Sequence, residues 1–128
     1  MSSPADIHKH KYAARLYERR SESVVLKRAE VSIGDWRPLP NQCHHNVTEW
    51  CAHDERYKPV RGWLYFDLAP LNCAKFVSHS AVRAPDGHLY DITPTSLPCL
   101  YPFIPTEESE EEYAAMNESG ITELWHGK

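Results

Sequence analysis

Two stretches organise this chain: PNQCHHNV at residues 40–47 and SHSAVRAPDGHLYDITP at residues 78–94. The first predicts a helix from Gln42 to about His53, because Asn41 is a good N-cap residue and the apolar positions that follow share one face. This helix carries Cys43 in its first turn. Unpaired backbone N–H groups and the helix dipole favour negative charge there, so the Cys43 thiol is expected to ionise more readily than a free thiol.

The second stretch predicts a β-hairpin that brings His79 and Asp91 together. Residues 84–87, APDG, have the composition of a type I turn closed by a left-handed glycine, and this turn fixes the register of the two strands. His79 then faces Thr93, and Asp91 is its diagonal neighbour on the same face, within reach of a hydrogen bond. An acidic partner on one imidazole nitrogen fixes the tautomer and leaves the other nitrogen for a thiol.

A cysteine at a helix start, a histidine on a later strand and an acidic residue on the adjacent strand resemble the papain-like and transglutaminase-like cysteine enzymes. The likeness covers roughly residues 40–94 and is carried by QCHHNV, by FVSHSAV and by the DITP that follows. It implies a small branch of that superfamily, a thiol hydrolase or acyl transferase that acts on amide or peptide bonds. Carried over by position, Cys43 is the nucleophile, His79 the general base and then acid, and Asp91 the residue that orients the imidazole.

The residues beside the cysteine differ from the papain pattern, which has small flanking residues and an oxyanion-hole glutamine several positions upstream. Here Gln42 and His44 flank Cys43, and Arg37 is the sixth residue upstream. Gln42 or Asn41 is therefore the expected oxyanion donor, together with the backbone N–H of Cys43. The candidate oxyanion and substrate residues are Gln42, Asn41, His44 and Trp63, although core packing is the more common role of a tryptophan.

Two other functions stay open. The first is a catalytically inactive papain-like interaction module with an unreactive Cys43. The second is a zinc site in the region rich in cysteine and histidine, but neither Cys51-Ala52-His53 nor Cys43-His44 has the spacing typical of zinc ligands. No metal ligand and no cofactor is therefore assigned.

The length and composition indicate a single globular domain over residues 1–128, and the predicted helices and strands make it an α+β domain. We expect an N-terminal helix to about Arg20, an antiparallel sheet packed against the central helix that carries Cys43, and an acidic helix at residues 106–116. The remaining predictions are strands at residues 24–31, 61–68 and 121–125, and a proline-rich loop at residues 97–105 that wraps over the sheet.

Charge and hydropathy limit the partners. The net charge is −4, and the overall acidity argues against a nucleic-acid partner. Basic residues predominate in the first forty positions and acidic residues after position 105, which predicts that the two ends lie near each other. The sequence shows neither an apolar run long enough for a bilayer nor a signal peptide, so a cytoplasmic, reducing location with free thiols is expected. A peptide or amide substrate is the expected partner; the oligomeric state is not predicted.

Overall fold

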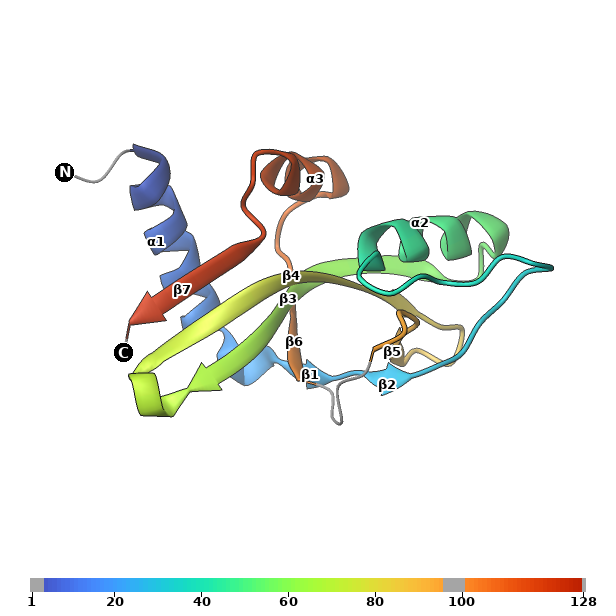
Figure 1. Cartoon of the computed structure of the whole chain (residues 1–128), viewed down its shortest axis with the longest axis horizontal. Helices are drawn as coiled ribbons and strands as arrows, with labels where there is room; N and C mark the ends of the chain where they lie inside the picture. Colours follow the sequence, from blue (N-terminus) through green and yellow to red (C-terminus); the bar gives the residue numbers. More distant parts are fainter. Residues whose placement is uncertain (1–3, 96–100, 128) are drawn as a thin grey trace.

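The computed structural model describes residues 4–95 and 101–127, which form one α+β domain (Figure 1). In chain order the elements are α1 (Pro4–Glu18), the 3₁₀ turn η1 (Arg20–Glu22), β1 (Val24–Val25), β2 (Lys27–Arg28), α2 (Cys43–His53), β3 (Lys58–Leu68), η2 (Ala69–Leu71), β4 (Cys73–Arg83), β5 (Leu89–Asp91), β6 (Pro102–Pro105), α3 (Glu110–Glu118) and β7 (Glu123–Gly127). The predicted α+β class and the three predicted helices are confirmed for these residues.

The sheet is mixed and nearly closed. Its strand order is β1-β6-β3-β4-β5-β2, and β7 also pairs with β4. The strands at the two ends of this order, β1 and β2, are consecutive in the chain and separated only by Leu26, so the sheet curls back toward itself. The prediction of a purely antiparallel sheet is wrong, because β2 runs parallel to β5.

The strand predicted at residues 24–31 is instead two short strands with different partners. Val24 and Val25 pair with β6, whereas Lys27 and Arg28 pair with β5. Leu26, between them, is buried at 2% exposure and packs with Ala81 and Phe103. Burial of this side chain stabilises the break by about 2 kcal/mol relative to an exposed leucine.

The predicted hairpin between β4 and β5 is confirmed. Ala84 N–H donates to the His88 carbonyl over 3.0 Å, and Gly87 has a φ of +87°, the left-handed conformation that glycine adopts without strain. The register pairs Val82 with Tyr90 and Arg83 with Leu89. Strand pairing ends there, so the predicted pairing of His79 with Thr93 does not form.

The C-terminal third departs from the prediction at residues 102–105 and at the start of the acidic helix, which the sequence predicts at residue 106. Residues 102–105 form β6 rather than a loop, since the prolines stand at the ends of a short strand where missing donors cost least; residues 97–100 of the predicted loop lie outside the described residues. Strand β6 approaches β3 closely at Gly62, where a Cβ would lie 2.3 Å from the Ile104 carbonyl oxygen. Helix α3 begins at Glu110 because Ser109 and Glu112 form a capping box.

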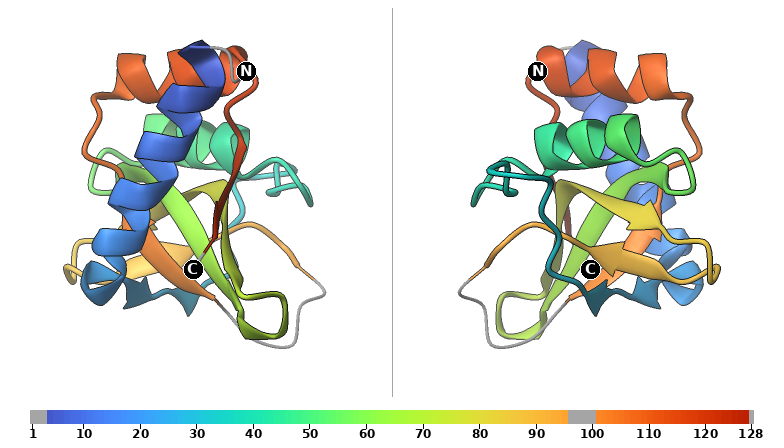
Figure 2. Two further views of the ribbon diagram at one scale, coloured as in Figure 1. Left: turned by 90° about the vertical axis from the view of Figure 1, so that its left-hand side faces the viewer. Right: turned by 90° about the vertical axis from the view of Figure 1, so that its right-hand side faces the viewer.

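The helices are arranged so that α2 and α3 lie on the same side of β3 and β4, while α1 runs beside β7 (Figures 1 and 2). Arg15 of α1 and Arg19, which follows α1, form ion pairs with Glu107, which confirms that the oppositely charged ends of the chain lie close together. Helix α2 docks on the sheet through Val47, which is fully buried in a cluster with Val82 and Ile92. This contact places α2 over the C-terminal half of β4.

Candidate active site

Cys43 lies in the first turn of α2, as predicted, and is its first residue, but the predicted cap, Asn41, is wrong. Gln42 occupies the N-cap position and makes no side-chain capping hydrogen bond, whereas Asn41 has a φ of +61° and turns the chain into the helix. Asparagine tolerates this left-handed conformation better than most residues. The first turn of α2 is therefore not capped by the Gln42 side chain, and its dipole acts on Cys43.

Asn46 holds the segment before Cys43, and the sequence analysis did not single it out. Its side chain is 1% exposed. The amide oxygen accepts from Leu39 N–H over 3.0 Å, and the amide nitrogen donates to the Leu39 carbonyl over 2.8 Å and to Thr93 Oγ1 over 3.1 Å. A single buried asparagine thus links the approach to the cysteine with the segment that follows Asp91.

His79 lies near the middle of β4, on a stretch whose edge is left open to the Cys43 side chain. On this edge β7 pairs with β4 up to Val77, and β5 pairs with it from Val82 onward, so none of the described strands covers the four residues between them. His44, in the first turn of α2, contacts Ser78 and Ser80 within this stretch. His79 is held from its far side by Asp91: Nε2 lies 3.0 Å from Asp91 Oδ2, and both side chains are largely buried.

Asp91 is itself fixed on both sides. Its other carboxylate oxygen accepts from Thr93 N–H over 3.0 Å, and its backbone carbonyl accepts from Ala29 N–H over 3.1 Å. Because a carboxylate only accepts, the His79 Nε2 carries a proton, and Nδ1 is the nitrogen left for the thiol. The predicted hydrogen bond between His79 and Asp91 is confirmed.

The electrostatics favour an ion pair between Cys43 and His79. Burial alone would raise the pKa of the Cys43 thiol, but hydrogen bonds from His44 and His79 lower that pKa to about 6. Burial alone would lower the pKa of His79, but its hydrogen bonds with Asp91 and Cys43 raise that pKa to about 9. The stable state between these values is a thiolate beside an imidazolium, the reactive form of a cysteine nucleophile.

A second imidazole reaches the thiol from the other face of β4. His44 Nδ1 lies 2.5 Å from Ser80 Oγ, and Nε2 lies 3.4 Å from Ser78 Oγ. Side chains alternate along a strand, so Ser78 and Ser80 are on the face opposite His79. Arg61 donates to Ser80 Oγ over 2.9 Å and pairs with Glu110. The sequence pattern gave no signal for Arg61 or Ser80, which meet His44 only through the pairing of β3 with β4.

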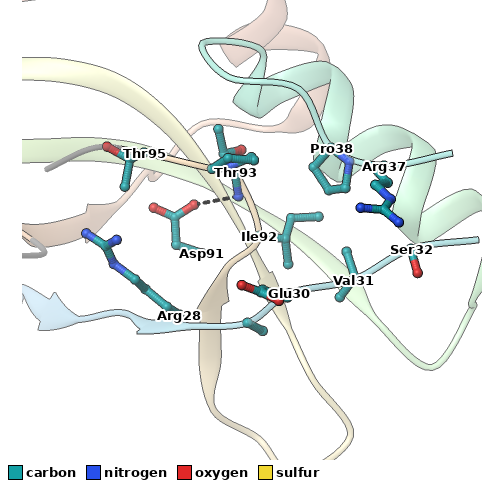
Figure 3. Close-up of a pocket in the computed structure, with 12 residues that line it drawn as sticks. Arg28, Glu30, Val31, Ser32, Arg37, Pro38, Asp91, Ile92, Thr93 and Thr95 are labelled. Atoms are coloured by element: carbon teal, nitrogen blue, oxygen red, sulfur yellow. Dashed lines mark hydrogen bonds between the residues drawn. The ribbon is translucent and has the colours of Figure 1, made fainter.

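Two cavities have Asp91, Thr93, Pro94 and Thr95 in common among the residues that line them. The smaller, of about 290 Å³, opens in front of Cys43, His79 and Asp91. Apolar side chains contribute much of its described wall, namely Leu26, Leu64, Val77 and Tyr101. The larger, of about 800 Å³, lies beyond Asp91 and is bordered by residues 28–32 and by Arg37 and Pro38 (Figure 3). Figure 3 shows Asp91 in the lining of the larger cavity, with the hydrogen bond from Thr93 that orients its carboxylate.

The remaining predicted site residues fall in three different places. Asn41 lines the smaller cavity, and the exposed Gln42 precedes the thiol directly. Trp63 does not line the site: it is fully buried in the core against Tyr12, and its indole N–H donates to the Tyr12 hydroxyl over 3.1 Å. Trp63 faces away because it follows Gly62, the residue that pairs with His79, and therefore projects from the opposite face of the sheet.

Neither a metal cluster nor a membrane helix is found in the described part of the chain. Residues 4–95 and 101–127 bring no three histidine, cysteine or acidic side chains together in a way that could hold a metal ion. Cys43, Cys51 and Cys73 are free thiols. Within the same ranges no helix has both the length and the apolar character needed to cross a bilayer.

Comparisons with known proteins identify no relative of this chain. The chain matched no protein-family model, and searches against curated proteins and solved structures returned no match.

Proposed function

We propose that this protein is a thiol hydrolase or acyl transferase that cleaves amide or peptide bonds through Cys43, His79 and Asp91. One observation carries the proposal: a thiol at a helix N-terminus contacts an imidazole that is paired with a buried carboxylate, at the wall of a cavity. Nucleophile, base and orienting residue are thus in the geometric relation that covalent acyl transfer requires.

The reaction follows from the charges of the resting site. The Cys43 thiolate attacks the substrate carbonyl carbon, a C–S bond forms, and the carbonyl oxygen becomes negatively charged. The His79 imidazolium gives its Nδ1 proton to the leaving nitrogen, the C–N bond breaks, and the amine departs. Water, or an amine in the transferase case, then attacks the thioester with His79 Nδ1 as base, and the thiolate leaves.

Asp91 keeps the proton of His79 on Nε2 throughout, so that Nδ1 is the nitrogen that exchanges protons with substrate. The donors for the carbonyl oxygen are the backbone N–H of Cys43 and the side chain of Gln42 or Asn41, which flank the thiol. The cavity in front of the thiol accommodates the acyl part of the substrate.

The test is the rate at which each cysteine reacts with iodoacetamide between pH 4 and 10, read by peptide mass spectrometry. At pH 7 a thiol with a pKa near 6 is about thirty times more ionised than one with the ordinary pKa near 8.5, so Cys43 should react far ahead of the other thiols. Cys51, whose pKa is raised by burial, is the internal control.

A second measurement addresses acyl transfer itself. A burst of nitrophenol from p-nitrophenyl acetate, with acetylation of Cys43, is expected from the wild type. Cys43→Ala and His79→Ala should each abolish the burst while the circular dichroism spectrum is kept. A full burst from Cys43→Ala would show that another residue is acylated and would overturn the mechanism. A Cys43 that alkylates only above pH 8 would favour the inactive interaction module.

A further inference from the structure

His44 is tied into a buried chain of hydrogen bonds that the proposed reaction does not use. Ser80 is fully buried, and its Oγ lies 2.5 Å from His44 Nδ1 and 2.9 Å from the Arg61 guanidinium. The Arg61 side chain is only 11% exposed and is paired with Glu110 at 3.1 Å. Arg61 also donates to the His44 carbonyl over 3.2 Å, so the backbone of His44 is anchored to β3 and its ring to β4.

The proton positions in this chain follow from what each group can do. A guanidinium only donates, so the Ser80 oxygen is the acceptor of the bond from Arg61. The hydroxyl hydrogen of Ser80 then points to its other partner, His44 Nδ1, which must accept it. A neutral imidazole with an accepting Nδ1 carries its proton on Nε2.

The reverse arrangement leaves a buried hydroxyl hydrogen without an acceptor in the described part of the chain. If His44 Nδ1 carried a proton and donated it, the Ser80 oxygen would face two donors, and its own hydrogen would have no partner among the hydrogen bonds of the described residues. Among the other groups around the ring, Ser78 is neutral, Tyr113 presents its ring at 5.7 Å, and the negative charge of Glu110 is taken up by Arg61. The Cys43 thiolate would favour an imidazolium, but its charge is already matched by the imidazolium of His79.

The protonated Nε2 faces the reactive side of β4. It lies 3.4 Å from Ser78 Oγ. Because Nδ1 is taken by Ser80, Nε2 is also the nitrogen that His44 has left for its interaction with the Cys43 thiol. Ser78 borders the same cavity as Cys43 and His79. The N–H of His44 and the N–H of His79 thus approach one sulfur from the two faces of the strand.

We propose that His44 is a neutral Nε2–H donor to the Cys43 thiolate, held in that tautomer by Ser80 and Arg61, while proton transfer belongs to His79 alone. This proposal rests on the proposed function of the same site and adds a positioning residue to it. His44 stabilises the anion without exchanging protons with substrate, and Ser80 and Arg61 act through His44.

The tautomer is tested first, by ¹⁵N shifts of the histidine ring nitrogens in the full chain at pH 7. We expect a protonated Nε2 and an unprotonated Nδ1 for His44, in contrast to a His79 ring protonated at both nitrogens. In Ser80→Ala, His44 should lose this preference and populate both tautomers. A proton on Nδ1 of His44 in the wild type would overturn the proposal whatever the reactivity of Cys43.

The role is tested by the iodoacetamide rate of Cys43 in His44→Ala, His44→Gln and the matched control His45→Ala, the exposed histidine next in sequence. A hydrogen bond to a charged group stabilises the thiolate roughly 10- to 100-fold, so its loss in His44→Ala should move the midpoint of the pH profile from about 6 to roughly 7–8. The rate at pH 7 should then be roughly 2- to 10-fold lower than in the wild type. His44→Gln keeps an N–H donor and should recover part of the rate, and His45→Ala should match the wild type.

The outcomes separate the two proposals. Loss of reactivity in His79→Ala but not in His44→Ala overturns the role of His44 and leaves the proposed function intact. A wild-type Cys43 without early reactivity overturns both. A His44→Gln rate as low as that of His44→Ala also counts against a donor role, because a hydrogen-bond donor is then not what the thiolate requires.

Discussion

The two carboxylate oxygens of Asp91 have different partners, so this one residue determines which nitrogen of His79 carries a proton. Oδ1 accepts from Thr93 N–H and Oδ2 accepts from His79 Nε2. In Asp91→Asn the amide oxygen is required by Thr93, so the NH₂ group faces His79 and forces Nε2 to accept. The proton of a neutral His79 then moves to Nδ1, the nitrogen that must receive the thiol proton.

Asp91→Asn should therefore lower the alkylation rate of Cys43 at pH 7 by about tenfold, the difference between a charge-assisted and a neutral hydrogen bond. The loss is smaller than in His79→Ala, and the pKa of His79 should fall toward its ordinary value. Asp86→Asn, which changes an exposed carboxylate in the turn of the same hairpin, is the control and should leave the rate unchanged. A rate in Asp91→Asn equal to that of the wild type would mean that the carboxylate does not orient His79.

At this scale the sequence predicted what local rules decide. Cys43 at a helix start follows from the residues around it, and the proximity of His79 and Asp91 follows from the APDG turn. The partners of His44 were not predictable, because Ser80 and Arg61 carry no motif and meet only when β3 pairs with β4. Trp63 was misassigned because a one-residue difference in strand position reverses the face of the sheet.

At the scale of elements, α3 supports the strand that carries His79 through Tyr113. The Tyr113 hydroxyl accepts from His79 N–H over 3.2 Å and donates to the Gly62 carbonyl over 2.6 Å, so it connects the backbones of two residues that face each other across β3 and β4. Tyr113 is 3% exposed, and burial raises its pKa, which keeps the hydroxyl protonated. The position of His79 thus depends on a helix that begins at residue 110.

Tyr113→Phe should destabilise the fold by about 1–3 kcal/mol, the cost of leaving a buried carbonyl without its partner. It should also slow the alkylation of Cys43 at pH 7, because the backbone of His79 is no longer fixed from α3. Thermal unfolding and the iodoacetamide rate measure the two effects. Tyr90→Phe, which removes an exposed hydrogen bond to Asp86, is the matched control and should change stability by no more than about 0.5 kcal/mol. Equal effects of the two substitutions on thermal stability and on the alkylation rate of Cys43 would mean that Tyr113 neither stabilises the fold through this contact nor positions His79.

For the whole molecule, the class and the helices were predictable from pattern, but the closure of the sheet was not. A break at Leu26 that sends β1 and β2 to opposite ends of the strand order depends on the space left between Ala81 and Phe103. Strand β6 depends on the absence of a side chain at Gly62. Both are contacts between segments far apart in sequence, which no local pattern contains.

The ion pair between Cys43 and His79 also predicts how stability depends on pH. The pKa of Cys43 is depressed to about 6 in the folded chain, so its contribution is fully present above the unfolded pKa of about 8.5 and is lost as pH falls through 6. The pKa of His79 is raised to about 9, so its contribution is fully present below the unfolded pKa of about 6.5 and is lost as pH rises through 9. Between these limits the two slopes are opposite, because the folded site keeps on His79 the proton that the unfolded chain keeps on Cys43.

The wild type should therefore show a nearly flat free energy of unfolding between pH 6.5 and 8.5, measured by urea titration. Cys43→Ser removes the stability contribution that rises with pH. It leaves the contribution of His79, which falls with pH, since Asp91 still raises the pKa of His79. Its stability should decline steadily with pH over the same window. Cys73→Ser, at the far end of β4, is the control and should keep the flat profile. Parallel profiles for wild type and Cys43→Ser would exclude an ion pair in the resting protein, because the thiol would then be protonated in both the folded and the unfolded chain.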